Sequence, residues 1–122
     1  MIRLLLVDDQ PAVLRGLGLR LALEPDIQIV GEASTGREAL ALALALSPDV
    51  VLMDVEMPEM DGIETAAALR AADSRSSVVI LSIHDDPPTR LRALAAGAVA
   101  FVEKGGTTDS LLTAIRQAAR QA

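Results

Sequence analysis

The stretch Val50–Asp54, which reads VVLMD, joins a run of apolar residues to an acidic residue. Val50–Met53 is one of five such runs, each rich in Val, Ile or Leu; the others are Arg3–Val7, Ile27–Val30, Val78–Leu81 and Ala98–Val102. Most of these runs lack the polar alternation of a half-exposed strand. The pattern is typical of strands in a parallel sheet that is covered on both faces.

Longer segments with helical character separate these strands. They begin near Pro11, Thr35, Asp61, Pro87 and Thr107. Five strands that alternate with five helices predict an α/β fold, an open parallel sheet with helices on both faces. Neither an internal repeat nor a linker interrupts the pattern, so we expect residues 1–122 to form a single domain, with no output domain in this chain.

Several residues indicate where the helices begin and end. Ser34 or Thr35, together with Glu38, resembles a capping box. Gly97 is placed to end a helix in the left-handed conformation. The stretch Asp85–Pro88 puts two aspartates before two prolines, which a first helical turn tolerates because its N–H groups have no helical partner.

Two segments fit the helical prediction less well. Gly16 and Gly18 fall inside the first helix, where each costs roughly 1 kcal/mol relative to Ala. Ala39–Leu46 alternates Ala and Leu with the period of a strand. Because both residue types are strong helix formers, we predict a helix with one pair of poorly buried leucines.

Composition limits the function. The net charge of −6 argues against nucleic-acid binding, which needs a basic surface. No apolar run approaches the ~20 residues of a membrane span, and Met1–Val7 is too short for a signal-peptide core, so we expect a cytoplasmic protein without membrane contact. The absence of cysteine excludes disulfides and thiolate metal sites. Lys104 is the only lysine among eleven cationic side chains.

Polar side chains follow four of the five predicted strands. Asp8-Asp9 follows the first strand, Asp54 the third, Ser82 the fourth and Lys104 the fifth. In open α/β sheets, ligands bind at the carboxyl ends of the strands. If the strand order is 2-1-3-4-5, strands 1 and 3 are neighbours and the three aspartates lie close together. Each residue alone could be a helix cap or a turn residue; their joint placement favours a site.

Three neighbouring carboxylates need either a shared proton or a cation to offset their repulsion. An all-oxygen set of ligands favours Mg²⁺. We expect His84, the only histidine, to be a surface loop residue rather than a ligand. Lys104 and Ser82 add the positive charge and the hydroxyl donor that a phosphoryl group needs. A carboxylate screened by Mg²⁺ and Lys104 can attack phosphorus and form an aspartyl phosphate.

The sequence resembles the receiver domain of bacterial two-component response regulators along essentially its whole length. The markers are Leu6–Asp9 (LVDD), Met53–Pro58 (MDVEMP) with Asp61-Gly62, Ser82, and Phe101–Lys104 (FVEK). Finer features resemble the NarL/FixJ subfamily: Asp8–Pro11, Arg15–Leu17, Val30–Ala33 and His84–Asp86. The resemblance implies a flavodoxin-like (βα)5 fold with strand order 2-1-3-4-5.

The resemblance also implies a role for each site residue. Asp54 is the expected phosphoacceptor for a sensor histidine kinase, and Asp9, Asp8, Asp54 and the backbone carbonyl of Glu56 are the expected Mg²⁺ ligands. Ser82 and Lys104 would bind phosphoryl oxygens. Ser82 and Phe101, the only Phe, Tyr or Trp residue, would form the switch. Glu56 and Ile83 would tune phosphoryl lifetime, and Leu14 would contact the kinase.

The resemblance implies a regulatory protein, not an enzyme, with self-phosphorylation and self-dephosphorylation as its only reactions. Phosphorylation would alter the face formed by the Pro87–Ala96 helix, the fifth strand and the Thr107–Ala119 helix. A homodimer could form through that face or through the first and last helices. The expected output is a C-terminal DNA-binding domain absent here; a stand-alone receiver is the alternative.

Four positions depart from the common receiver pattern. Ser82 replaces a frequent Thr and keeps the hydroxyl, Gln10 replaces a frequent His, Ala100 a frequent Gly, and Gly105 the proline that often follows the lysine. The last leaves the geometry of residues 104–106 open. Two other classes remain alternatives. A haloacid-dehalogenase-type phosphatase would need an Asp-x-Asp nucleophile motif, which Asp8-Asp9 lacks. A pseudo-receiver that only binds would lack an acidic residue or the lysine, and neither is missing.

Overall fold

The computed structural model describes residues 1–83 and 86–121. His84 and Asp85, about which the sequence made predictions, lie outside these residues. Strands and helices alternate along the chain: β1 (Ile2–Val7), α1 (Pro11–Leu21), β2 (Ile27–Ala33), α2 (Gly36–Leu46), β3 (Val50–Asp54), α3 (Gly62–Ala71), β4 (Ser77–Ser82), α4 (Pro87–Ala95), β5 (Ala100–Glu103) and α5 (Thr108–Ala119).

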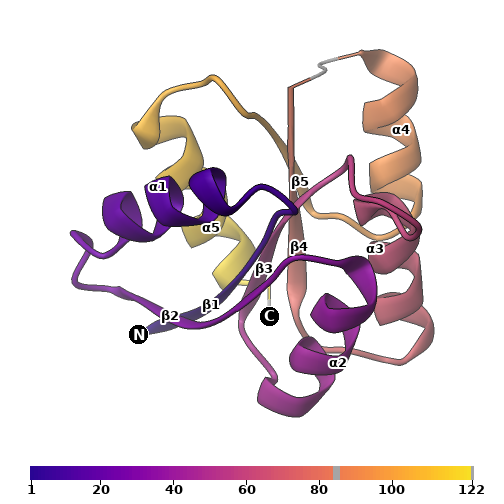
Figure 1. Cartoon of the computed structure of the whole chain (residues 1–122), viewed down its shortest axis with the longest axis horizontal. Coiled ribbons are helices and arrows are strands. Elements are labelled where there is room, and N and C mark those ends of the chain that lie inside the picture. Colours follow the sequence, from indigo (N-terminus) through magenta and orange to yellow (C-terminus); the bar gives the residue numbers. More distant parts are fainter. Residues whose placement is uncertain (84–85, 122) are drawn as a thin grey trace.

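The five strands form one parallel sheet in the order β2-β1-β3-β4-β5, which confirms the predicted topology. Helices α1 and α5 cover one face, and α2, α3 and α4 cover the other (Figure 1). Alternate residues of the central strands enter opposite cores. In β3, Leu52 packs with the α1–α5 core, whereas Val51 and Met53 pack with the α2–α4 core. The apolar stripe of α5, including Leu111 and Ile115, is buried against the sheet.

The helix boundaries follow the predicted residues with two refinements. Thr35 is the N-cap of α2, with its hydroxyl oxygen accepting the Glu38 N–H at 3.1 Å, while the Glu38 carboxylate accepts the Ser34 N–H at 3.0 Å. A complete capping box that the sequence reading missed joins Asp61 and Glu64 at the start of α3.

Three details of the sequence prediction are wrong. Strand β2 ends at Ala33, not Val30, because residues 5–7 of β1 pair with residues 31–33. Strand β5 begins at Ala100, not Ala98, because the Ala98 N–H donates to the Ala93 carbonyl and so belongs to the cap of α4. This cap uses Gly97 at φ +110°, the left-handed residue expected there. In α2, Leu44 is exposed but the other three leucines are half-buried, so the expected pair of poorly buried leucines is not found.

Candidate functional site

The carboxyl ends of β1 and β3 bring three aspartates together. Val7 of β1 pairs with Met53 of β3 in the parallel register, and the next residue along the chain is an aspartate in both cases. Asp8 and Asp54 therefore lie next to each other at the ends of neighbouring strands. Carboxylate oxygens of Asp8, Asp9 and Asp54 all lie within 4.8 Å of one another. Asp8 and Asp54 are buried and Asp9 is exposed, so the cluster opens to solvent on the Asp9 side.

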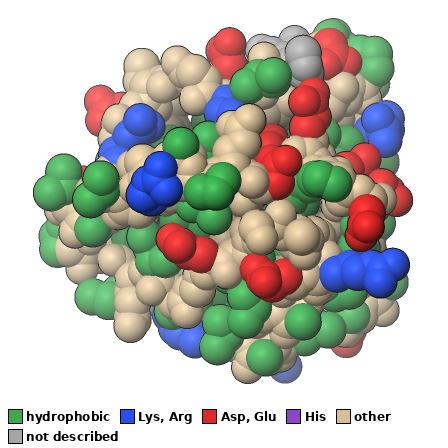
Figure 2. All heavy atoms as spheres, viewed as in Figure 1, with side chains coloured by type: hydrophobic (Ala, Val, Ile, Leu, Met, Phe, Trp, Pro, Cys, Tyr) green, Lys and Arg blue, Asp and Glu red, His purple; other side chains and the backbone are tan. Residues whose placement is uncertain are grey.

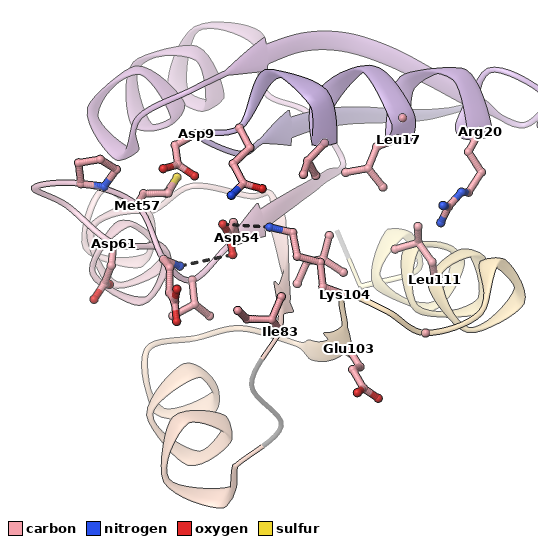
Figure 3. Close-up of a pocket in the computed structure, with 18 of the residues that line it drawn as sticks. Asp9, Leu17, Arg20, Asp54, Met57, Asp61, Ile83, Glu103, Lys104 and Leu111 are labelled. Atoms are coloured by element: carbon pink, nitrogen blue, oxygen red, sulfur yellow. Dashed lines mark hydrogen bonds and ion pairs between the residues drawn. The ribbon is translucent and has the colours of Figure 1, made fainter.

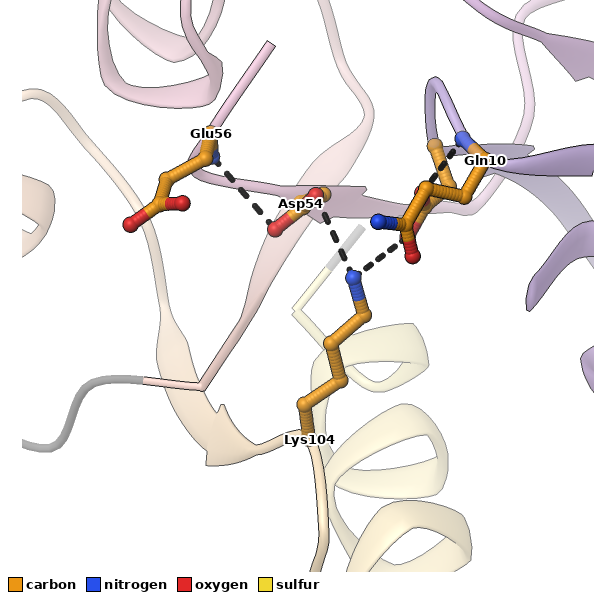
Figure 4. A network of polar contacts seen from close by, with 5 residues as sticks. Gln10, Asp54, Glu56 and Lys104 are labelled. Carbon is orange, nitrogen blue, oxygen red and sulfur yellow. Dashed lines mark hydrogen bonds and ion pairs between the residues drawn. The ribbon is translucent and has the colours of Figure 1, made fainter.

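The ammonium of Lys104 lies among these carboxylates. Its Nζ is 3.0 Å from Asp8 Oδ2 and 3.3 Å from Asp54 Oδ2 (Figure 4). Backbone groups hold the two buried aspartates: the Gln10 N–H donates to Asp8 Oδ1 at 2.9 Å, and the Glu56 N–H donates to Asp54 Oδ1 at 3.4 Å. The site is therefore oriented by the turns that directly follow β1 and β3.

Burial and charge shift two pKa values in the site. Burial raises the pKa of the Asp54 carboxyl, and the neighbouring Asp8 charge adds to the rise, although Lys104 opposes it. Burial alone would lower the pKa of Lys104, but its interactions with Asp8 and Asp54 outweigh that effect and raise it. Lys104 therefore stays cationic at neutral pH, while one cation faces three acidic groups.

This arrangement fits a hard divalent cation. Within the described part of the chain, Asp8 Oδ2 is buried and accepts no hydrogen bond; its contact with Lys104 is an ion pair. The possible side-chain ligands at the cluster are all carboxylate oxygens, the ligand type that Mg²⁺ prefers. The excess negative charge and the oxygen donors both match the predicted cofactor.

Ser82 ends β4 next to the cluster, and Phe101 lies on the neighbouring strand β5. Ser82 is buried at the end of β4, one residue beyond Leu81, which pairs with Asp54. The Ser82 carbonyl accepts the Lys104 N–H at 2.7 Å, which fixes the backbone of Lys104 next to β4. Phe101 is half-buried against the α2–α4 core. After Lys104 the chain turns, with the Gly106 N–H donating to the Glu103 carbonyl at 3.0 Å.

A cavity of about 800 Å³ opens over the site and continues between α1 and α5 (Figure 3). Asp9, Asp54 and Lys104 lie at one end, and Leu17, Arg20 and Leu111 line the other. Sequence reasoning missed this extension because it depends on how α1 packs beside α5. Glu56 and Ile83 also line the cavity, whereas Leu14, named as a kinase contact, packs against the α1–α5 core.

The surface around the site carries mixed charge. On the face viewed in Figure 2, arginine side chains are dispersed among acidic ones and do not gather into a basic patch. Within residues 1–83 and 86–121, no helix is both long and apolar enough to cross a membrane.

The fold and the site define a class: doubly wound α/β proteins with an acidic, lysine-containing pocket at the carboxyl edge of the sheet. A family model for the response regulator receiver domain matches residues 4–116. The chain belongs to this family. Receiver domains bind Mg²⁺ at such an acidic pocket.

Curated relatives agree with this assignment. An uncharacterised transcriptional regulatory protein of Bacillus subtilis, YxjL, is 40% identical over 98% of this chain. The nitrate/nitrite response regulator NarL of Escherichia coli is 37% identical over 95% of the chain. The chain spans about half the length of these relatives, 55% and 54% respectively.

A solved structure also matches closely. The signal receiver domain of the response regulator NarL from Mycobacterium tuberculosis superposes with a TM-score of 0.94 at 37% identity. The match covers 98% of this chain and 96% of that domain. The predicted family, of NarL type, and the predicted fold are both confirmed.

Proposed function

We propose that Asp54 accepts a phosphoryl group from a phosphohistidine on a sensor histidine kinase. The observation that carries the proposal is the contact of Lys104 with Asp54 inside the acidic cluster, at the mouth of an open cavity. A buried carboxylate beside one fixed cation is suited to in-line attack, because the cation offsets charge on the transferred group.

Asp9, Asp8, Asp54 and the backbone carbonyl of Glu56 would hold Mg²⁺. When bound, the ion would neutralise phosphoryl charge that the single lysine leaves uncompensated. In the transfer, a carboxylate oxygen of Asp54 forms a bond to phosphorus as the P–N bond to the kinase imidazole breaks, and the imidazole nitrogen takes up a proton. Lys104 and the Ser82 hydroxyl bind phosphoryl oxygens. Hydrolysis returns inorganic phosphate and the free carboxylate.

The added charge, roughly −1.5 to −2 at neutral pH, provides the signal. Drawing Ser82 toward the phosphoryl group leaves space that Phe101 fills, and the face formed by α4, β5 and α5 changes. The phosphoryl group selects one of two arrangements that already exist in equilibrium. The chain itself is regulatory, with self-phosphorylation and self-dephosphorylation as its only reactions.

The partners follow from the relatives. YxjL is a transcriptional regulatory protein and NarL a response regulator, and we infer that this receiver likewise controls transcription in the cytoplasm through a DNA-binding output domain. A stand-alone receiver is the alternative. Homodimers would form through the α4–β5–α5 face or through α1 and α5. The receiver, with a net charge of −6, does not itself bind nucleic acid.

The test is labelling with radioactive acetyl phosphate in Mg²⁺. The wild-type chain should incorporate an acid-stable, base-labile label, and Asp54→Asn should incorporate none. Asp73→Asn is the matched control, because Asp73 is exposed in a left-handed turn that Asn also tolerates. Equal labelling of Asp54→Asn and the wild type would refute the assignment.

A further inference from the structure

Arg90 of α4 lies over the ring of Phe101 in β5. The guanidinium carbon is 5.1 Å from the ring centroid, within the range of a cation–π interaction. The contact links α4 to the strand that ends next to Lys104. Neither the family pattern nor the charge on Arg90 alone would have indicated it.

Helix α4 has few other contacts with the protein core. Within α4, all of which the structure describes, Ala93 is the only buried residue, while Leu91 is 66% exposed. Arg90 and Ala93 are three residues apart and therefore share one face of the helix. At the far end, the Arg70 guanidinium donates to the Ala95 carbonyl at 3.1 Å. The Arg90–Phe101 contact is thus one of the contacts that join α4 to β5.

The ring of Phe101 and the side chain of Ser82 lie on the same face of the sheet. Phe101 pairs with Ile80, and Ser82 pairs with Glu103. Because residues two apart in a strand point to the same side, Ile80 and Ser82 share a face, and Phe101 shares it with them. On this face, Phe101 therefore lies two residue pairs from Ser82, with the Leu81–Val102 pair between them.

We propose that Arg90 is a positioning residue that holds the Phe101 ring toward α4 and opposes its movement toward Ser82. A contact made in only one of two states shifts their equilibrium by its full free energy. Arg90 therefore keeps the unphosphorylated chain in the inactive arrangement. It also sets the free energy that the phosphoryl group must supply to shift the chain to the active arrangement. This inference rests on the proposed phosphorylation of Asp54.

The experiment follows the Phe101 ring by NMR after selective labelling of phenylalanine with ¹³C. The chain contains one Phe, so every labelled ring signal comes from Phe101. Spectra are recorded with EDTA, and then in Mg²⁺ with increasing beryllium trifluoride, a mimic of the phosphoryl group. Arg90→Met removes the cation but keeps an aliphatic side chain, Arg92→Met removes the same charge from the same helix, and Arg90→Lys retains the cation.

In EDTA, the ring signals of Arg90→Met should lie part-way toward their position in the beryllium trifluoride complex. Its apparent affinity for beryllium trifluoride should rise about two- to five-fold, which corresponds to the roughly 0.5–1 kcal/mol of an exposed cation–π contact. Arg92→Met should match the wild type in both measurements, and Arg90→Lys should lie closer to the wild type than Arg90→Met.

If Arg90→Met and Arg92→Met behave alike, the role of Arg90 is refuted. That result is distinct from failure of the proposed function, in which the wild-type chain itself would not bind beryllium trifluoride, or Asp54→Asn would bind it equally well.

Discussion

The Lys104 ammonium nitrogen lies 3.0 Å from Asp8 Oδ2, and the Asp8 side chain is only 1% exposed. The single lysine of the chain therefore interacts with an expected metal ligand as well as with Asp54. In the metal-free protein Lys104 partly compensates the charge that Mg²⁺ would otherwise compensate. Its removal should therefore affect stability, metal affinity and phosphorylation in different directions.

Lys104→Met should lower the free energy of unfolding by about 1–3 kcal/mol in EDTA, because it leaves buried carboxylates without a counter-charge. The same change should tighten Mg²⁺ binding, since a competing cation is lost, and should reduce but not abolish labelling at Asp54. Urea titrations with and without Mg²⁺ measure the first two effects. Lys104→Arg, which keeps the charge, is the control. If Lys104→Met had the same free energy of unfolding as the wild type in EDTA, the prediction would be contradicted.

Asp54→Asn should raise the unfolding midpoint at pH 7 in EDTA. Burial and the Asp8 charge raise the Asp54 pKa above its usual 3.8, so the folded state disfavours the ionised carboxylate. The free-energy cost of ionising Asp54 in the folded state is absent below the usual pKa. It grows as the pH rises and is complete above the raised pKa. The gain from Asp54→Asn should therefore shrink toward pH 3.5. Thermal melts compare it with Asp73→Asn; a lower midpoint for Asp54→Asn at pH 7 would argue against repulsion in the site.

Most of the fold and the acidic cluster could be predicted from the sequence because both depend on local patterns. Apolar runs mark the strands, and a polar residue at the end of a run lies at the carboxyl edge of a parallel sheet. This placed Asp8, Asp54 and Lys104 correctly. The two-residue error at the start of β5 arose because Ala98 is apolar in both a strand and a helix cap, and only the hydrogen bond to Ala93 distinguishes them.

Contacts between distant surface side chains could not be predicted in this way. Arg90 meets Phe101, and Arg116 meets Asp26, through the packing of helices against other elements. In the sequence Arg90, Arg116 and Asp26 look like ordinary surface residues. Phe101 stands out as the only aromatic residue, but no periodicity relates its position to that of Arg90. The cavity between α1 and α5 has the same origin, because its walls belong to elements at opposite ends of the chain.

Two glycines should respond oppositely to substitution by alanine. A methyl group at Gly62, the first residue of α3, would overlap the Asp54 carbonyl oxygen, and that oxygen belongs to rigid backbone. Gly62→Ala should cost about 1–3 kcal/mol and reduce labelling at Asp54. Gly16 lies inside α1 with no atom within 4 Å of such a methyl group, so Gly16→Ala should stabilise by roughly 0.4–1 kcal/mol. Denaturant titrations measure both, and equal effects would show that the close approach of α3 to Asp54 is not maintained in solution.

Arg116 should stabilise the protein in a pH-dependent way. From α5 it donates to Asp26 Oδ2 at 2.9 Å and to Glu24 Oε1 at 2.8 Å, joining the last helix to the loop before β2. The hydrogen bond from Arg116 holds the pKa of Asp26 below its usual 3.8. A lowered acid pKa contributes stability that is fully present above the usual value and is lost as the pH falls through the lowered one.

Arg116→Met should therefore melt at a lower temperature than the wild type at pH 7. The difference between the two melting temperatures, the gap, should narrow as the pH falls below 3.8. High salt should also narrow it at pH 7, because these side chains are partly exposed to solvent. Arg120→Met, one turn further along the chain, removes an equal charge and serves as the control. A gap that persists unchanged at low pH and in high salt would mean that Arg116 acts through the packing of its aliphatic stem and not through its charge.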